Sequence, residues 1–169
     1  MSVVDERPPT PGALDTSFWA ATALAEAHGY LLKMFEVHCP QAVVAEIENE
    51  RPPTLRADAA LFQQLRLHHV ISVTDPKAVT VKVFGRGEAS VLSLAVEKHW
   101  TALINEFRAG EHGRTVLGLT VMNVPQLICA VCAVGYVPSV KAQAMLAQIA
   151  DVTSPRLMQE ATRVLAALP

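Results

Sequence analysis

Five residues whose side chains could bind a cation lie at strand ends or within helices of the expected fold. Asp15 ends the first predicted strand, Glu46 lies in the helix after the second, Glu88 opens a later helix, and Asn105 and Glu106 end a further strand. In α/β proteins ligands bind beyond the carboxyl ends of parallel strands. Carboxylates gathered at that edge repel one another and favour a hard divalent cation, Mg²⁺ or Mn²⁺. Such an ion activates water and stabilises charge on a phosphodiester under attack.

Each acidic residue taken alone also has a purely structural interpretation. Asp15 could cap the helix that follows it, a role that Ser17 could fill instead. Glu46 could be a solvated helix residue, and Glu88 could be placed by the helix macrodipole. Glu106 could point to the other face of its strand. Both interpretations therefore stay open for each acid taken alone.

The composition indicates a compact single-domain protein with no bulk charge signal. The chain has 169 residues, of which 51% are hydrophobic and 18% charged, and its formal net charge is −2. Any nucleic-acid binding must therefore depend on a local patch. Three cysteines and an acidic, proline-rich N-terminus without an apolar segment predict a reduced, cytoplasmic setting. The uncharged stretch 115–140 is interrupted by proline and glycine, so a strand and a buried helix are expected there, and no membrane span.

Hydrophobic periodicity predicts strands that alternate with helices, which indicates an α/β fold with a mostly parallel central sheet. We expect a flexible leader over 1–12, one domain over 13–150 and a C-terminal helical extension over 151–169 packed on it. The predicted strands are 13–14, 36–40, 70–73, 101–104 and 120–124. The predicted helices are 17–27, 30–35, 41–50, 56–67, 88–98, one near Arg114, 126–135, 140–149 and 155–168.

Two cysteines form the spacing CxxC, Cys129 and Cys132, within an apolar predicted helix. A redox pair normally lies at a helix N-terminus, where the thiolate is stabilised, so buried structural cysteines are the expected interpretation. A zinc site that adds His38 and Cys39 is a weaker alternative, because the second pair lacks the usual ligand spacing.

Several short motifs, in order and spacing, resemble the PIN-domain nucleases and in particular a prokaryotic subgroup of PIN-like proteins. The resemblance covers roughly residues 13–150. The matching motifs are LDTS at 14–17, VVAEIE at 43–48, GRGEASVLSLA at 85–95, LINE at 103–106, GR at 113–114 and GLTVMNVPQLICAVCAVGYVPSV at 118–140.

The resemblance implies a three-layer α/β/α PIN-like fold and a Mg²⁺- or Mn²⁺-dependent ribonuclease, often the toxin of a toxin–antitoxin pair and often dimeric. By the same resemblance, Asp15, Glu46 and Glu88 match the first three metal-binding acids. Asn105 stands where the family usually has its fourth acid, and Glu106 matches the second member of that acidic pair.

Four further positions receive supporting roles. Thr16 and Ser17 match hydroxyls that support the first acid in the family. Arg86 and Arg114 could steady a phosphate, although exposed arginines are often only solvated. The alternative hypothesis is a PIN-like module with little or no catalysis that binds RNA or a protein partner. Asn105 favours that alternative, because an amide ligates a cation more weakly than a carboxylate.

Overall fold

The structure, a computed structural model, describes residues 8–49 and 56–168. Strands and helices alternate along most of this part of the chain, as the periodicity predicted. The strands are β1 (Thr10–Leu14), β2 (Phe35–Cys39), β3 (Ser72–Val73), β4 (Thr101–Leu103) and β5 (Val121–Met122). The helices are α1 (Thr16–Leu24), α2 (His28–Met34), α3 (Gln41–Asn49), α4 (Arg56–Leu67), α5 (Arg86–Lys98), α6 (Phe107–Thr115), α7 (Val124–Ala133), α8 (Ser139–Gln148), η2 (Ala150–Val152) and α9 (Pro155–Ala167).

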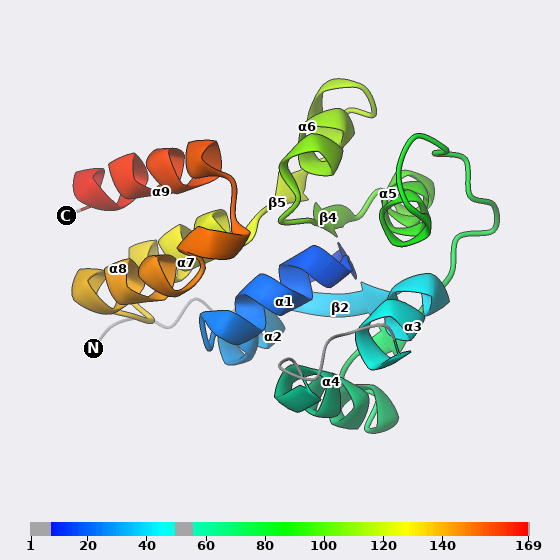
Figure 1. Ribbon diagram of the computed structural model, residues 1–169, viewed down its shortest axis with the longest axis horizontal. Helices are drawn as coiled ribbons and strands as arrows, with labels where there is room; N and C mark the ends of the chain where they lie inside the picture. The colour runs from blue at the N-terminus through cyan, green and yellow to red at the C-terminus, as the bar shows by residue number, and fades with distance from the viewer. Residues whose placement is uncertain (1–7, 50–55, 169) are drawn as a thin grey trace.

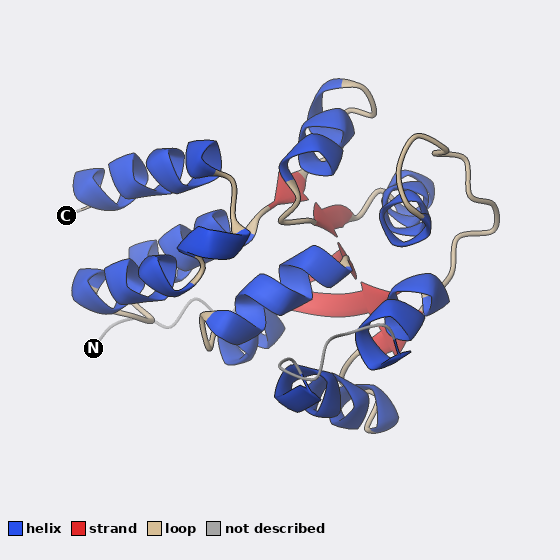
Figure 2. Cartoon of the chain, in the orientation of Figure 1, coloured by secondary structure: helices blue, strands red, loops and turns tan. Residues whose placement is uncertain are grey.

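The five strands form one parallel sheet in the order β3-β2-β1-β4-β5, flanked by helices in a three-layer α/β/α arrangement (Figures 1 and 2). Gly12 pairs with Val37 of β2 on one side and with Thr101 of β4 on the other, so β1 is central. The chain adds strands in one direction from β1 to β3 and then crosses to the opposite side of β1 for β4. The boundary between β1 and β4 is therefore the switch point, where α/β sheets bind ligands.

Apolar side chains on the strands and on one face of each helix form the core between the layers. Trp19 of α1 and Phe62 of α4 are fully buried, with ring centroids 5.3 Å apart in an edge-to-face arrangement. The Trp19 indole Nε1 donates to the Asp58 carbonyl at 3.2 Å, which satisfies its only polar group. These contacts hold α4 against α1.

The C-terminal helices pack on α7 at the β5 side of the molecule (Figure 1). Leu157, Ala161 and Leu165 form the buried stripe of α9, at the spacing of one helix face. Asn123 caps α7 in a capping box with Gln126, and proline follows at the start of the helix.

The structure confirms the predicted fold class and shifts some element boundaries. Helix α4 has the predicted bounds, whereas β1 begins at Thr10, within the stretch expected to be a loose leader. Backbone pairing of Thr10 with Phe35 extends the strand, a long-range contact that local sequence does not reveal. In the described part of the chain, no helix is both long and apolar enough to cross a membrane.

Candidate functional site

Asp15 lies at the centre of the candidate site, directly after β1 at the switch point. It is the N-cap of α1, and its Oδ2 accepts hydrogen bonds from the Ser17 backbone N–H at 3.0 Å and from the Ser17 hydroxyl at 2.5 Å. The capping role expected of either residue therefore belongs to Asp15. Its side chain is buried, and charged groups in that position are held by hydrogen bonds or by counter-charges.

Ser17 connects Asp15 to the end of β4. Its Oγ accepts hydrogen bonds from the backbone N–H groups of Asn105 and Glu106, both at 3.1 Å, while its hydroxyl proton goes to Asp15. A hydroxyl that donates once and accepts twice uses its full hydrogen-bonding capacity. Ser17 therefore joins the Asp15 carboxylate to the backbone at the end of β4.

Glu46 reaches the same region from α3. Its Oε2 accepts a 2.6 Å hydrogen bond from the Thr16 hydroxyl. Its carboxylate also lies against Gly87 in the first turn of α5, where an added Cβ would lie 2.7 Å from Glu46 Oε2 and closer still to Oε1. Only glycine leaves room for this carboxylate between α1 and α5.

Glu88 completes a group of three acids, here called the carboxylate cluster: Asp15, Glu46 and Glu88. Burial raises the pKa of Asp15 from 3.8 to about 6, and the negative charges of Glu88 and Glu46 add to the increase, against the hydrogen bonds from Ser17. Within the described residues the Glu88 carboxylate has no hydrogen-bond partner. The carboxylates of the cluster therefore repel one another, and a bound cation would reduce that repulsion.

Asn105 does not join the carboxylate cluster. Its Nδ2 donates to the Thr153 hydroxyl at 3.0 Å and its Oδ1 accepts from the Val124 backbone N–H at 3.1 Å, both in the interior. The side chain thus ties the end of β4 to the start of α7 and to the linker before α9. The predicted ligand role is replaced by a structural one, because both polar atoms already have buried partners.

Glu106 also has a structural role. It is the N-cap of α6, where its Oε1 accepts from the Arg108 N–H at 3.0 Å and its Oε2 from the Ala109 N–H at 2.6 Å. A carboxylate at this position also complements the helix dipole. With both oxygens turned toward the α6 backbone, Glu106 does not supply the predicted cation ligand in this conformation.

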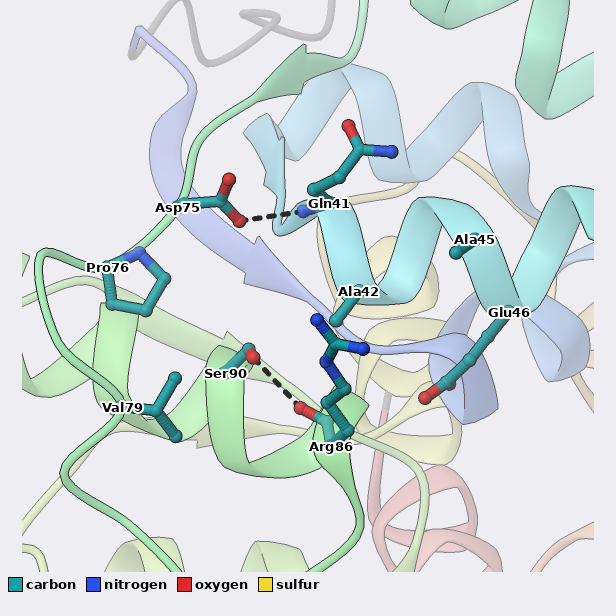
Figure 3. A pocket seen from close by; sticks show the side chains of 9 residues that line it. All are labelled: Gln41, Ala42, Ala45, Glu46, Asp75, Pro76, Val79, Arg86 and Ser90. Atoms are coloured by element: carbon teal, nitrogen blue, oxygen red, sulfur yellow. Dashed lines mark hydrogen bonds between the residues drawn. The ribbon is translucent and has the colours of Figure 1, made fainter.

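The two predicted phosphate-binding arginines have different environments. Arg114 donates through Nη2 to the Val121 carbonyl at 3.3 Å and to Gln126 Oε1 at 3.2 Å, so it links α6 to β5 and α7. Arg86 is exposed at the start of α5 and lines a cleft of about 680 Å³ together with Glu46 (Figure 3). Of the two, Arg86 is the one placed beside the carboxylate cluster.

The donor set suits a hard cation only in an open form. Within residues 8–49 and 56–168, no three or more His, Cys, Asp or Glu side chains are grouped so that they could hold a metal ion together. Mg²⁺ is commonly bound through one or two carboxylates and keeps several waters. The carboxylate oxygens of the cluster fit that mode and not a closed three-ligand centre.

Of the two cysteines expected to be buried, Cys129 is buried and Cys132 is partly exposed. Cys129 Sγ donates to the Ala161 carbonyl at 3.5 Å, and burial raises the pKa of this thiol to about 11. Cys39 is buried in β2, where burial and nearby carboxylates raise its pKa well above the usual range. A thiol that stays protonated is a poor nucleophile and a poor zinc ligand.

Two residues important to the site were missed at the sequence level. Gly87 received no role of its own in the motif at 85–95, although its missing side chain makes room for Glu46. Asp75 lies two residues after the end of β3 and accepts a 2.8 Å hydrogen bond from the Gln41 N–H at the start of α3. An acid shortly after a predicted strand is the same signal that singled out Asp15, so a similar argument could have identified it.

Comparison with known proteins adds no relative. No protein family model, curated protein or solved structure was found to match this chain.

Proposed function

We propose that this protein is a divalent-cation-dependent endoribonuclease of the PIN type. The observation that carries the proposal is the carboxylate cluster at the switch point of the sheet, in which a buried Asp15 has its pKa raised to about 6 with Glu88 and Glu46 contributing. Clustered negative charge lowers stability, and carboxylates with raised pKa values are found most often at functional sites.

In this proposal the residues divide the work. One or two of the cluster carboxylates, Asp15 with Glu46 or Glu88, would bind Mg²⁺ or Mn²⁺ and leave its other positions to water. When bound, the cation lowers the pKa of water and neutralises charge on the phosphodiester. Ser17 and Thr16 fix the orientations of Asp15 and Glu46 through their short hydrogen bonds, and Arg86 offers a positive charge to the RNA backbone.

The PIN resemblance extends the proposal to partners and setting. By analogy with the family, the protein acts in the cytoplasm as a homodimer, with RNA as substrate and an antitoxin protein as inhibitor. These parts of the proposal depend on the motif order alone.

A second candidate function is an RNA- or protein-binding module without catalysis. It is favoured by the position of Asn105, whose side chain is bound by Thr153 and Val124 instead of facing the carboxylate cluster. With that position lost, the remaining acids would bind a cation more weakly.

A matched pair of variants on α3 tests the nuclease proposal. Glu46 belongs to the cluster, whereas Glu48, one half-turn away, forms an ion pair with Arg66 at 2.7 Å. Cleavage of a mixed-sequence single-stranded RNA is measured with Mn²⁺ or with chelator. We expect Mn²⁺-dependent cleavage that falls by about 100-fold or more in Glu46→Gln and stays within about threefold in Glu48→Gln, in line with the loss of one electrostatic contact in a reacting site.

Three results would contradict the proposal. They are no cleavage by the wild type, cleavage that persists in chelator, and cleavage undiminished in Asp15→Asn. The first of these, combined with RNA binding that remains, would support the non-catalytic module.

A further inference from the structure

The cleft beside the carboxylate cluster has a shape and a charge pattern that suit one nucleotide. It lies between the start of α3, the loop that follows β3 and the start of α5, and its volume of about 680 Å³ is within the range of small-molecule sites. Its walls include the small side chains of Ala42, Ala45 and Ser90, which leave space for a flat ring. Because Glu46 lines it, the cleft is continuous with the candidate catalytic site.

The polar groups of the cleft are separated along its length. Figure 3 shows Glu46 at one end, Asp75 with Pro76 at the other, and the Arg86 guanidinium between them beside Ala42. Among the described residues, Arg86 forms no ion pair, so its charge is available to a ligand. A phosphate at Arg86 would place the attached base toward Asp75, Pro76 and Val79.

Asp75 is an acceptor held in a fixed orientation at the base end. Its Oδ1 accepts the hydrogen bond from the Gln41 backbone N–H at 2.8 Å, and its Oδ2 has no partner among the described residues. A carboxylate in this position accepts hydrogen bonds from an amino group on a base edge and repels a carbonyl oxygen there. Pro76 and Val79 supply apolar contacts for the ring faces.

We propose that this cleft binds the nucleotide next to the cleaved phosphodiester, and that Asp75 selects a base with an exocyclic amino group. The inference rests on the proposed ribonuclease function, since it names the preferred substrate of that site. Arg86 binds the phosphate, Asp75 reads the Watson–Crick edge, and the loop after β3 forms the wall between them. Uracil, with a carbonyl in place of the amino group, is disfavoured.

The test uses the cytidine and uridine 5′-monophosphates, which differ at the position that Asp75 would read. Each is titrated into the full-length protein without divalent cations, and the amide signals of Ala42 and Ser90 are followed by two-dimensional NMR. We expect CMP to bind at least about fivefold more tightly than UMP, the effect of one hydrogen bond gained against one repulsive contact.

Matched variants separate the two contacts. Asp75→Asn keeps an acceptor for the Gln41 N–H but adds an amide donor, so the CMP-to-UMP ratio should fall to about one or reverse. Arg86→Gln should weaken both nucleotides by about fivefold or more without changing their ratio, whereas Lys82→Gln, which removes an exposed charge outside the cleft lining, should change neither.

The proposal is overturned if CMP and UMP bind equally to the wild type, if neither shifts the cleft amides, or if Asp75→Asn leaves the ratio unchanged. Cleavage assays on the same samples keep this result apart from the function. Tighter binding of CMP than of UMP without RNA cleavage would contradict the nuclease proposal but support a base-selective nucleotide site. RNA cleavage with equal binding of CMP and UMP would support the nuclease proposal and contradict base selection by Asp75.

Discussion

The Ser17 hydroxyl lies 2.5 Å from Asp15 Oδ2 and donates its proton to that carboxylate. The Ser17 Oγ also accepts hydrogen bonds from two backbone N–H groups at the end of β4. Three segments of the switch point, the end of β1, the start of α1 and the end of β4, therefore meet at one side chain. The orientation of Asp15 and the geometry of the strand edge depend on each other.

Replacement of Ser17 by alanine should destabilise the protein and disturb the site together. Two backbone N–H groups lose their acceptor, and Asp15 loses a hydrogen bond, so we expect a loss of about 2 kcal/mol in the free energy of unfolding. The pKa of Asp15 should rise further, because one of the contacts that lowers it is removed. Urea denaturation measures the first effect and NMR titration of the carboxyl measures the second.

Thr162→Ala is the control for this change. That hydroxyl bonds only to the Met158 carbonyl on an exposed helix surface, and its loss should cost less than about 0.5 kcal/mol. Equal losses for the two variants would contradict the role given to Ser17.

The stability of Asp15→Asn relative to the wild type should depend on pH. The pKa of Asp15 is 3.8 unfolded and about 6 folded, so between these values the folded protein binds more protons and its stability falls as pH rises. Well above pH 6, keeping Asp15 charged in the folded protein lowers the free energy of unfolding by about 3 kcal/mol, as the size of the pKa shift implies. The asparagine variant avoids this cost, and we expect it to be more stable than the wild type by about 1–2 kcal/mol at pH 7.5, after allowance for a weaker hydrogen bond from Ser17.

The difference should disappear at pH 4, where Asp15 is mostly protonated in the folded protein. Urea denaturation at the two pH values checks it. A variant that is less stable than the wild type at pH 7.5 would show that the hydrogen bonds outweigh burial of the charge.

Gly87→Ala should impair the site while leaving the fold intact. The new Cβ would overlap the Glu46 carboxylate, which must move away from Thr16, but the displaced atoms are the end of a flexible side chain. Under the nuclease proposal we expect RNA cleavage to fall by about tenfold or more. Thermal stability should be unchanged or slightly higher, since alanine favours helix.

Gly29→Ala in α2 is the matched control, because nothing lies within 4 Å of its added Cβ. Cleavage should be unaffected there. A Gly87→Ala variant that cleaves RNA as fast as the wild type would show that the position of Glu46 against α5 is not required.

Asn105→Asp introduces the acid that PIN-domain nucleases usually have at the position this residue resembles, yet we expect no gain in Mn²⁺ affinity. The side chain is directed at Thr153 and Val124, so the new carboxylate would be buried there and not in the carboxylate cluster. Its charge should lower stability at pH 7.5 by about 1–2 kcal/mol. Calorimetric titration with Mn²⁺ and urea denaturation measure the two effects, and a tenfold tighter Mn²⁺ site would contradict the assigned orientation.

Under the nuclease proposal, Glu106→Ser should retain RNA cleavage, because serine can still cap α6 without offering a carboxylate to a cation. We expect stability within about 1 kcal/mol of the wild type and cleavage within about threefold. Glu106→Ala, which removes the cap, should be less stable with similar activity. A large loss of cleavage in the serine variant would indicate that Glu106 binds the cation after all.

The sequence by itself determined the layer architecture and the approximate location of the site. Alternation of apolar strands with amphipathic helices leaves few topologies open, since parallel crossovers are right-handed and ligands gather at the switch point. The amphipathic pattern of residues 56–67 gave the bounds of α4, and Asp15 at the end of β1 marked the strand edge.

Only the tertiary structure decided which oxygen faces which neighbour. Asn105 turns toward Thr153, which lies in a linker 48 residues further along the chain. The pattern of apolar residues in the strand does not predict so distant a contact. The fit of Glu46 against Gly87 likewise depends on how closely α3 and α5 approach. Hydrophobic periodicity places elements through averages over many residues, whereas a single polar side chain follows the one partner that its folded surroundings provide.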